Sequence, residues 1–482
     1  MTLILLLLFI CLGWLAWRHV GKLLPDGLDM RGETHSIAAD RVRFLHDLTT
    51  TDGAGTTVRE QEIFTTLFAL IGQAEHYVLI DFFLLNDQQG RRGTPSFRPL
   101  AEQLVDHLCA RKNEIPGLQI DVLSDPINSV YGSAPSPLFE RLRAAGINLI
   151  TTDLVPLRDS NPLYSVWWRL LLRRIPDRGR YLPHPFDASA DRISLTGWLT
   201  MANFKANHRK VTVLDHDGEL LSLVTSANPH AASSSHSNIA LLINDRGLAE
   251  DIYRSEQAVA GMSGGCLHPL PNLAAKKVEE DNRSRLKVSL VTEARIGAAI
   301  AAAIHKAQRG DIIRIAMFYL ADRDITNTLL AAAKRGASVM LILDPNRDAF
   351  GYEKNGVPNR PVAAELIRQG LGQIAVRWYR THGEQFHTKL VMAEYRSNAT
   401  ATLILGSANL TRRNIGNYNL ESNLEVTGNS STEPFIAVKH YYDRLWNNGD
   451  YTFTLPYSAM ADPSRLKYFQ YLVQEELGLG SF

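Results

Sequence analysis

The stretch HRKVTVLD (208–215) recurs in the second half of the chain as HTKLVMAE (387–394). Both copies follow the pattern H-x-K-x4-[DE], and each is followed by S-x-N, at 226–228 and at 407–409. One match to so short a pattern is weak evidence, whereas two matches at corresponding points of one chain form a strong signal. We therefore predict a chain of two related halves, each with one copy of the motif.

The sequence that precedes each motif repeats as well. Residues 63–85 and 296–320 each show a helical pattern of apolar residues and then a continuous apolar run, which is typical of a buried strand. A second apolar run follows in each half and stops at an Asp-Pro turn signal, at Pro126 and at Pro345. Strands that alternate with helices predict an α/β fold with a mostly parallel sheet in each half.

The residue types in the motifs suit attack on a phosphodiester. Histidine and lysine two residues apart on a strand point to the same face. Lysine offers a cation to the phosphate oxygens, Ser and Asn add neutral donors, and histidine serves as nucleophile, acid or base. One histidine can then attack phosphorus while the other protonates the leaving oxygen, with no metal or other cofactor. The predicted catalytic residues are His208, Lys210, Asp215, His387, Lys389 and Glu394, and the predicted substrate-binding residues are Ser226, Asn228, Ser407 and Asn409.

The two halves differ in length. The motif histidine follows the Asp-Pro turn by 83 residues in half one and by 43 in half two, so half one carries about 40 extra residues. A stretch rich in Gly, Pro and charged residues separates the halves. We predict a membrane anchor at 1–24, a first half at 25–265 (motif 208–228, insertion 154–198), a linker at 266–292 and a second half at 293–482 (motif 387–409).

The insertion contains YSVWWRLLLRRIP (164–176), in which aromatic and basic residues are interleaved. Tryptophan and arginine together suit the headgroup layer of a membrane. The alternative is a helix packed into the core with a basic exposed edge. The residues expected to contact a membrane are Trp167, Trp168, Arg169, Arg173 and Arg174.

The N-terminal residues 2–17 form one apolar run, which Arg18 follows directly. The run is slightly shorter than the roughly 20 residues of a membrane-spanning helix. It lacks the positive start and the A-x-A site of a cleaved signal. We expect an uncleaved single-pass anchor, with a buried helix and a cleaved signal as the alternatives. Positive charge only on its C-terminal side favours a cytoplasmic body, although one short span leaves the side open.

The composition narrows the possible partners. The chain has 482 residues, with Lys+Arg 51 against Asp+Glu 50 and a formal charge of +1, so it has no overall positive field for nucleic acid. Its 3 cysteines are too few for a disulfide framework. The expected partners are a phospholipid substrate and a membrane, and no nucleic acid.

The paired motifs with their trailing S-x-N resemble the phospholipase D superfamily, and among its members the chain is most similar to bacterial cardiolipin synthases. The resemblance implies two tandem α/β sandwich halves that share one active site at their interface. It also implies that His208 forms a phosphohistidine and that His387 acts first as acid and then as base. Glu421, in NYNLESN, matches the downstream acid that orients the histidine of the other half and would serve His208.

The chain departs from the family pattern at three points. Glu394 replaces the usual Asp, and Thr225 stands where a Gly commonly precedes the first S-x-N. His236-Ser237-Asn238 stands where half two has Glu421-Ser422-Asn423, so the acid that serves His387 is not identified. Asp215 and Glu394 keep two interpretations, as supports of the site or as solvated residues at the ends of strands.

The resemblance implies a phosphatidyltransferase in the bacterial inner (plasma) membrane that makes cardiolipin from phosphatidylglycerol. A phospholipase D hydrolase that releases phosphatidic acid is the first alternative, because it would share the phosphohistidine intermediate. An endonuclease of the same superfamily is the second. The apolar N-terminus, the Trp-Arg insertion and the balanced charge argue against it.

Overall fold

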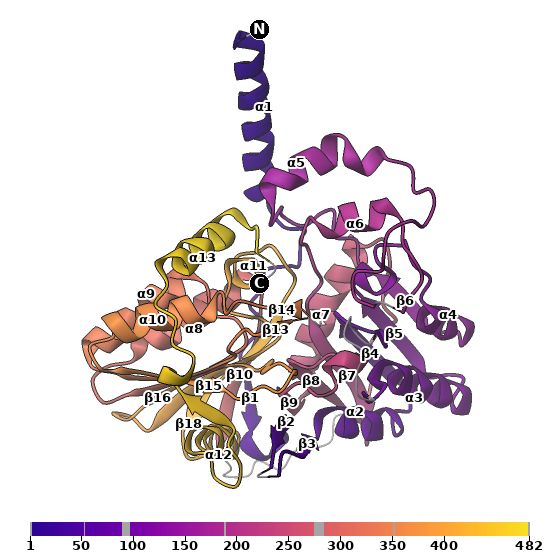
Figure 1. Cartoon of the computed structure of the whole chain (residues 1–482). Coiled ribbons are helices and arrows are strands. Elements are labelled where there is room, and N and C mark those ends of the chain that lie inside the picture. Colours follow the sequence, from indigo (N-terminus) through magenta and orange to yellow (C-terminus); the bar gives the residue numbers. More distant parts are fainter. Residues whose placement is uncertain are drawn as a thin grey trace.

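The computed structural model describes residues 2–52, 54–88, 97–187, 189–273, 284–349 and 352–480. Within them the chain forms two large β-sheets that lie side by side, with helices around them (Figure 1). The helix α1 (Thr2–Val20) projects from this body (Figure 1). The predicted α/β class is therefore confirmed.

The first sheet has eight strands among the described residues, in the order β3-β2-β9-β8-β7-β4-β5-β6. Its strands are β2 (Val42–Thr51), β3 (Thr57–Gln61), β4 (Tyr77–Phe82), β5 (Gln119–Ser124), β6 (Asn148–Thr151), β7 (Lys210–His216), β8 (Glu219–Thr225) and β9 (Asn238–Asn244). The helices of this half are α2 (Ile63–Ile71), α3 (Leu100–Glu114), α4 (Pro137–Ala144), α5 (Pro162–Leu170), α6 (Leu195–Met201) and α7 (Arg246–Met262).

The second sheet has nine strands in the described part of the chain, in the order β1-β10-β18-β17-β16-β11-β12-β15-β19. Its strands are β1 (His35–Ala38), β10 (Arg285–Thr292), β11 (Ile312–Met317), β12 (Ser338–Leu343), β15 (Ile374–Tyr379), β16 (Lys389–Tyr395), β17 (Thr400–Gly406), β18 (Ser422–Asn429) and β19 (Thr454–Pro456). The helices are α8 (Ala294–Lys306), α9 (Arg323–Arg335), α10 (Asn359–Gln369), α11 (Arg412–Ile415), α12 (Glu433–Asn447) and α13 (Arg465–Leu477), and a small ribbon joins β13 (Asp348–Ala349) to β14 (Tyr352–Glu353).

The motif strands β7 and β16 lie inside their sheets at equivalent places. In each half three strands are parallel, β4-β5-β6 and β11-β12-β15, and the motif strand opens an antiparallel meander. The prediction of a mostly parallel sheet is therefore wrong. The reason is the short return after each motif: Asp217 and Gly218 join β7 to β8, both with positive φ (51° and 75°), which suits a tight hairpin turn.

The predicted boundary between the halves differs from the division of the sheets. The predicted linker 266–292 includes β10, which pairs with β18. The strand β1, from the start of the predicted first half, pairs with β10 in the second sheet. The strand β10 was missed in the sequence because the charged residues of the linker run into its alternating pattern. Its residues are buried from Val288 onward. Residues 274–283 of the predicted linker lie outside the described residues.

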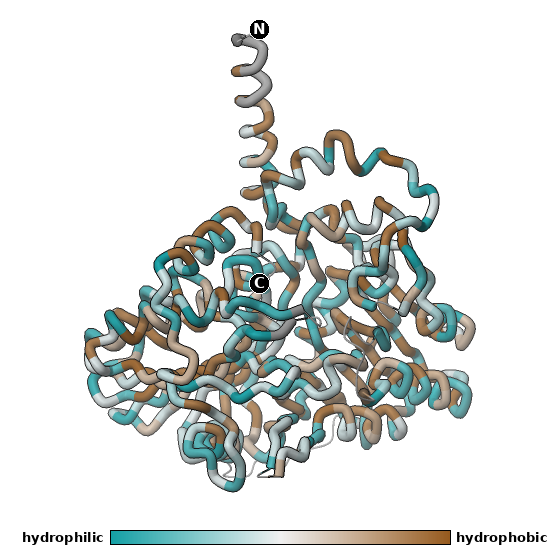
Figure 2. The backbone as a smooth tube through the Cα atoms, viewed as in Figure 1, coloured by the Kyte–Doolittle hydropathy of each residue, from teal (hydrophilic) through white to brown (hydrophobic). Residues whose placement is uncertain are grey.

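The main apolar core lies between the two sheets. It combines side chains of both halves, such as Val213 and Leu241 with Leu403 and Phe386, and it is completed by α7 and α12. Separate clusters lie under α2 and α3 on the outer face of the first sheet and under α8 and α9 on that of the second. Figure 2 shows hydrophobic residues along the interior strands, while hydrophobic and hydrophilic residues alternate on the outer helices.

The N-terminal helix does not support the predicted anchor at 1–24. None of the helices in the described part of the chain is long and apolar enough to cross a membrane. The helix α1 packs against α5, and Ile10, Trp14 and Trp17 are exposed along it. Met1 and the side chains of residues 2–5 and 7–9 lie outside the described residues.

Candidate active site

The two motif histidines lie at the interface between the two halves. The backbone N–H of His208 donates to the carbonyl of Leu420 at 2.9 Å. On the other side Phe386 forms a bridge with Ser237, whose N–H donates to Gln385 at 3.1 Å. Each residue pair thus joins the start of one motif strand to the opposite half, so that both motifs face one site.

His208 is bound to an acid from the second half. Its Nδ1 lies 2.8 and 3.0 Å from the two carboxylate oxygens of Glu421, which is fully buried. Burial lowers the pKa of His208 to about 4, although the charge of Glu421 opposes this shift. Burial raises the pKa of Glu421, but the interactions with His208, the charge of Lys210 and the hydrogen bond from Ser407 outweigh it and lower that pKa. His208 is therefore neutral, with Nδ1–H directed at Glu421 and a lone pair on Nε2.

His387 is bound to an amide instead. Its Nδ1 lies 3.1 Å from Oδ1 of Asn238, which also accepts a hydrogen bond from Ser226 at 3.0 Å. Burial and the charge of Lys389 lower the pKa of His387 well below its ordinary value. An amide cannot stabilise an imidazolium as a carboxylate does, so the two histidines have different environments.

The sequence aligned His236 with Glu421, but the residue equivalent to Glu421 in the structure lies two positions later. Ser226 contacts Asn238 as Ser407 contacts Glu421, and each serine oxygen also accepts the next backbone N–H, from Ile239 and from Ser422. Asn238 therefore occupies the position of Glu421, whereas His236 does not. The ring of His236 lies beside that of His387, at 5.8 Å between centroids.

The two motif lysines are equivalent and buried. Nζ of Lys210 donates to the carbonyl of His208 at 2.7 Å, and Nζ of Lys389 to that of His387 at 2.8 Å. Each ammonium lies over an aromatic ring, that of Phe83 or of Phe318, at 5.3 and 5.1 Å. Burial lowers the pKa of Lys210 to about 7 and that of Lys389 well below its ordinary value. An anion bound between the two lysines would stabilise their charged forms and would therefore raise both pKa values again.

The asparagines of the S-x-N segments are placed less symmetrically. Asn228 accepts a hydrogen bond from the N–H of Leu84 at 3.3 Å through Oδ1. Oδ1 of Asn409 is buried and has no hydrogen-bond partner among the described residues. A buried polar atom without a partner is costly, which is consistent with a place in a ligand site.

A different hydrogen-bond acceptor in each half explains why Thr225 stands where a glycine is common. In half two, Asn423 accepts the N–H of Ala408 at 3.1 Å, and a Cβ on Gly406 would lie 2.7 Å from that asparagine oxygen. In half one, the hydroxyl of Thr225 itself accepts the N–H of Ala227 at 3.0 Å. The threonine therefore replaces the asparagine as acceptor, and no glycine is needed.

Asp215 and Glu394 do not reach the site. Asp215 accepts the backbone N–H groups of residues 75–77 at 3.1, 2.9 and 2.7 Å, so it orders the start of β4. Glu394 forms ion pairs with Arg314 at 2.8 Å and Lys439 at 3.5 Å. The structure does not bring them together with the histidines, because a strand of seven residues separates the last motif position from its histidine. Their contacts favour the interpretation as supports of the site.

The two Asp-Pro turns have a role that we did not predict from the sequence. Asp125 accepts the N–H of Asn207 at 2.7 Å, and Asp344 accepts that of Phe386 at 2.7 Å. Each carboxyl group thus fixes the residue directly before a motif histidine. Burial raises the pKa of both carboxyl groups to about 7. Their occurrence in both halves was the signal that could have identified them as positioning residues.

A second network that the sequence did not reveal connects the halves through Arg209. This fully buried residue forms ion pairs with Glu256 at 3.0 Å and Glu293 at 2.8 Å. The same oxygen of Glu293 accepts the N–H of Glu421 at 3.0 Å. The middle residue of the first H-x-K triplet therefore helps to position the acid that holds His208. None of the described clusters of His, Cys, Asp and Glu could hold a metal ion.

The Trp-Arg segment of the insertion, which includes α5, lies outside the site, and α5 packs against α1. Trp167 is exposed, Trp168 is half-buried, and Arg173 and Arg174 are exposed. Arg169 turns inward to the buried Asp159 instead, with Nε at 3.2 Å. The structure thus brings four of the five predicted membrane-contact residues to the surface, at least in part.

Comparisons with known proteins agree with the predicted fold. Residues 300–446 match the family described as "Cardiolipin synthase, PLD-like domain". The crystal structure of phosphatidylserine synthase from Haemophilus influenzae Rd KW20 is similar, with a TM-score of 0.56 and 14% identity over 96% of this chain and 98% of that one. A polyphosphate kinase from Porphyromonas gingivalis has a TM-score of 0.42 and 12% identity over 83% of this chain and 49% of the kinase. No curated protein is similar enough in sequence to match the chain.

Proposed function

We propose that this chain is a member of the phospholipase D superfamily and that it transfers phosphatidyl groups through a phosphohistidine. The match of residues 300–446 to a cardiolipin synthase-type domain supports the family. One observation carries the proposal: two buried histidines, one bound to a carboxylate and one to an amide, flank two buried lysines at the contact of the halves. Lysine charge and histidine lone pairs suit a phosphodiester anion.

In the first step Nε2 of His208 attacks phosphorus. The bond from phosphorus to the headgroup oxygen breaks, and His387 gives its proton to that oxygen. Glu421 stabilises the positive charge that His208 acquires, and Lys210 and Lys389 bind the phosphate oxygens. The phosphate itself raises the pKa of His387, so that the acid form is populated when substrate is bound.

In the second step another alcohol attacks the phosphohistidine. His387, now neutral, accepts the proton of the alcohol, and the N–P bond breaks to release His208. We propose phosphatidylglycerol as both donor and acceptor, which gives cardiolipin and one free glycerol. The description of the matched family supports this choice. The similar structure of a phosphatidylserine synthase supports only the fold, because the identity is 14%.

Incubation of the purified protein with phosphatidylglycerol as the sole lipid tests the reaction. We expect cardiolipin and glycerol in equal amounts, because each transfer releases one headgroup. Separation of the lipids by thin-layer chromatography and an enzymatic glycerol assay measure both products. Phosphatidic acid in place of cardiolipin would identify a hydrolase, and cleavage of a plasmid without any lipid product would identify an endonuclease.

We also propose that the protein works at the bacterial plasma membrane and that α5, together with the short helical turn Leu172–Arg174 that follows it, contacts the lipid headgroups. Trp167, Arg173 and Arg174 are exposed on this segment. The helix α13, which carries the exposed Leu466 and Phe469, lies at the same end of the body (Figure 1). Arginine pairs with lipid phosphate and apolar side chains enter the interface, so this end of the molecule suits a membrane surface.

The triple variant with Trp167, Arg173 and Arg174 replaced by serine is expected to bind vesicles of phosphatidylglycerol about tenfold or more weakly. Two arginines near an anionic surface contribute about 1 kcal/mol each, and the indole contributes apolar burial. Sedimentation with vesicles of a chain that begins at Pro25 measures the affinity without α1. A variant with Arg309 and Lys334 replaced by serine loses the same two positive charges and controls for the charge change. Equal binding of the two variants would show that this segment does not contact lipid.

A further inference from the structure

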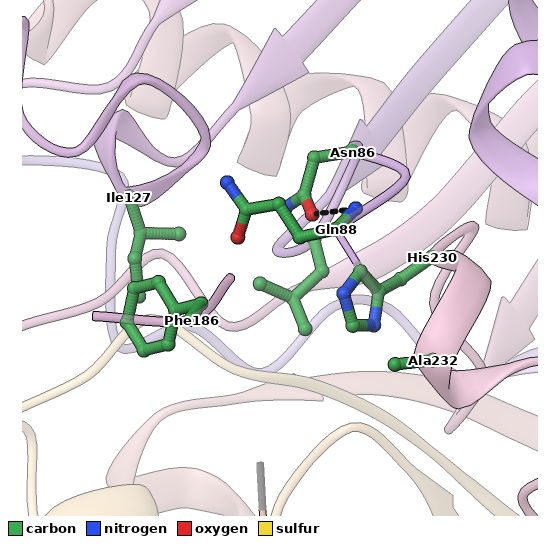
Figure 3. A pocket seen from close by; sticks show the side chains of 7 residues that line it. Asn86, Gln88, Ile127, Phe186, His230 and Ala232 are labelled. Atoms are coloured by element: carbon green, nitrogen blue, oxygen red, sulfur yellow. Dashed lines mark hydrogen bonds between the residues drawn. The ribbon is translucent and has the colours of Figure 1, made fainter. Parts of the chain in front are cut away.

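A pocket lies on the half-one side of the active site, and the mechanism above does not use it. It is lined by Leu84, Asn86, Gln88, Ile127, Phe186, His230 and Ala232 (Figure 3). In Figure 3 the side chains of Ile127 and Phe186 stand on one side of an open space, and His230 and Ala232 on the other. Its empty volume, including the open mouth, is about 360 Å³. Because this figure includes open solvent at the mouth, the pocket suits only a small part of a ligand.

The pocket shares its wall with the catalytic groups. The N–H of Leu84 donates to Oδ1 of Asn228, at 3.3 Å. The neighbouring Phe83 lies against the ring of His208, at 4.8 Å between centroids, and under Nζ of Lys210. Ile127 follows the turn at Asp125 that fixes the motif histidine. A group bound in the pocket would therefore lie beside a phosphate that His208 attacks.

The pocket presents mainly apolar surface. The amide of Asn86 is engaged, because it donates to Asn128 at 2.6 Å and accepts the N–H of Gln88 at 3.1 Å. His230 bonds to Ser233 at 2.8 Å through Nδ1, and burial lowers its pKa to about 4, so it is neutral. The amide of Gln88 is the remaining polar group, and its Nε2 lies 3.4 Å from Nε2 of His184. The pocket therefore holds no charged group, and carbon atoms of Leu84, Ile127, Phe186 and Ala232 form most of its wall.

The pocket is specific to half one. Phe186 comes from the insertion that half two lacks. At the position that corresponds to Leu84, half two has the larger Tyr319, whose ring lies against that of Phe318 at 4.0 Å. The asymmetry of the insertion thus coincides with an asymmetry beside the active site.

We infer that this pocket binds the first methylene groups of one acyl chain of the donor phospholipid. The inference rests on the proposed function, because it assumes a phospholipid phosphate between His208 and His387. An uncharged cavity with apolar walls favours hydrocarbon over a hydroxylated headgroup, which would leave hydroxyl groups without partners. The volume limits the bound part to a segment of the chain, and the rest would extend from the mouth.

The test replaces Ala232 by tryptophan, which fills the pocket from a half-buried position. Two soluble substrates with the same phosphodiester are compared: dihexanoyl phosphatidylglycerol, and glycerophosphoglycerol, which has no acyl chains. Release of glycerol is measured for both. Each buried methylene contributes roughly a fourfold gain in affinity, so the ratio of kcat/KM for the two substrates is expected to fall roughly tenfold or more. The same fall with Phe186→Ala is the second expectation, and it decides the question if Ala232→Trp does not fold.

Ala110→Trp, at an exposed position of α3, is the matched control and is expected to keep the wild-type ratio. A loss of kcat/KM that is equal for both substrates would place the headgroup in the pocket and overturn the inference. An unchanged ratio in a folded Ala232→Trp or Phe186→Ala variant would overturn it as well. If the wild-type protein releases no glycerol from either substrate, the proposed function fails, and this result is distinct from the others.

Discussion

Alanine in place of His208 is expected to abolish the phosphoenzyme, whereas alanine in place of His387 is expected to trap it. His208 supplies the only nitrogen that becomes bonded to phosphorus in the proposed reaction, so its removal lowers kcat by about 10⁴-fold or more. His387 is needed twice, as acid and as base. With a phosphatidyl ester of p-nitrophenol the leaving group needs no proton, so His387→Ala completes the first step and stops at the second.

The measurement uses this ester with a labelled phosphorus atom. Acid-labile and base-stable label on the protein reports the phosphohistidine, and released p-nitrophenolate reports the first step. His387→Ala is expected to give a burst of one p-nitrophenolate per protein with the label retained, and His208→Ala is expected to give neither. His305→Ala, at an exposed position of α8, controls for the loss of a histidine. The reverse pattern would assign the nucleophile to His387.

The sequence predicted the features that are local or repeated. The doubled H-x-K pattern located both histidines and lysines, and the family match at residues 300–446 supports the resemblance to the phospholipase D superfamily in the second half. The repeated strands and helices predicted the α/β class. These features could be predicted because a motif on one strand fixes the relative positions of its own residues, and only of those.

The features that escaped prediction depend on contacts between distant segments. The partner of His387 was sought two residues too early, because Ser237-Asn238 and Ser422-Asn423 match as sequence but not as structure. The last acid of each motif was assigned to the site because the pattern includes it, yet the length of the strand carries Asp215 and Glu394 away from the histidines. Arg209 and Glu293 are 84 residues apart, and no local pattern connects them.

The asymmetry between Glu421 and Asn238 suits the opposite tasks that we propose for the two histidines. A nucleophile that becomes cationic on phosphorylation benefits from a carboxylate, and His208 has one. An acid that must release its proton benefits from a partner without charge, and His387 has the amide of Asn238. The division of labour that the resemblance implies therefore has a physical basis in this chain, and exchanging the charges of the two partners tests it.

Glu421→Gln is expected to lower kcat by about 10² to 10⁴-fold, because the cationic phosphohistidine loses its counter-charge and the glutamine amide competes for the orientation of the ring. The pH dependence of kcat/KM shows in which direction this substitution changes the pKa of His208. His208 must be neutral to attack, so activity is lost as the pH falls through the pKa of His208, which is about 4. Glu421 raises that pKa. Its neutralisation therefore lowers the pKa further and moves the acid limb to lower pH.

Asn238→Asp is the opposite change and is expected to move the alkaline limb of kcat/KM upward by about one unit or more. His387 must carry a proton in the first step, and its pKa is lowered in the wild-type protein, so activity falls as the pH rises above that pKa. A carboxylate beside it raises the pKa and keeps the acid form at higher pH. The hydroxyl of Ser226 already donates to this position, as that of Ser407 does to Glu421, so the new carboxylate keeps a partner. Asn398→Asp, in an exposed turn, adds the same charge far from the site and is expected to leave the profile unchanged. An alkaline limb that does not move in Asn238→Asp would show that His387 is not the acid.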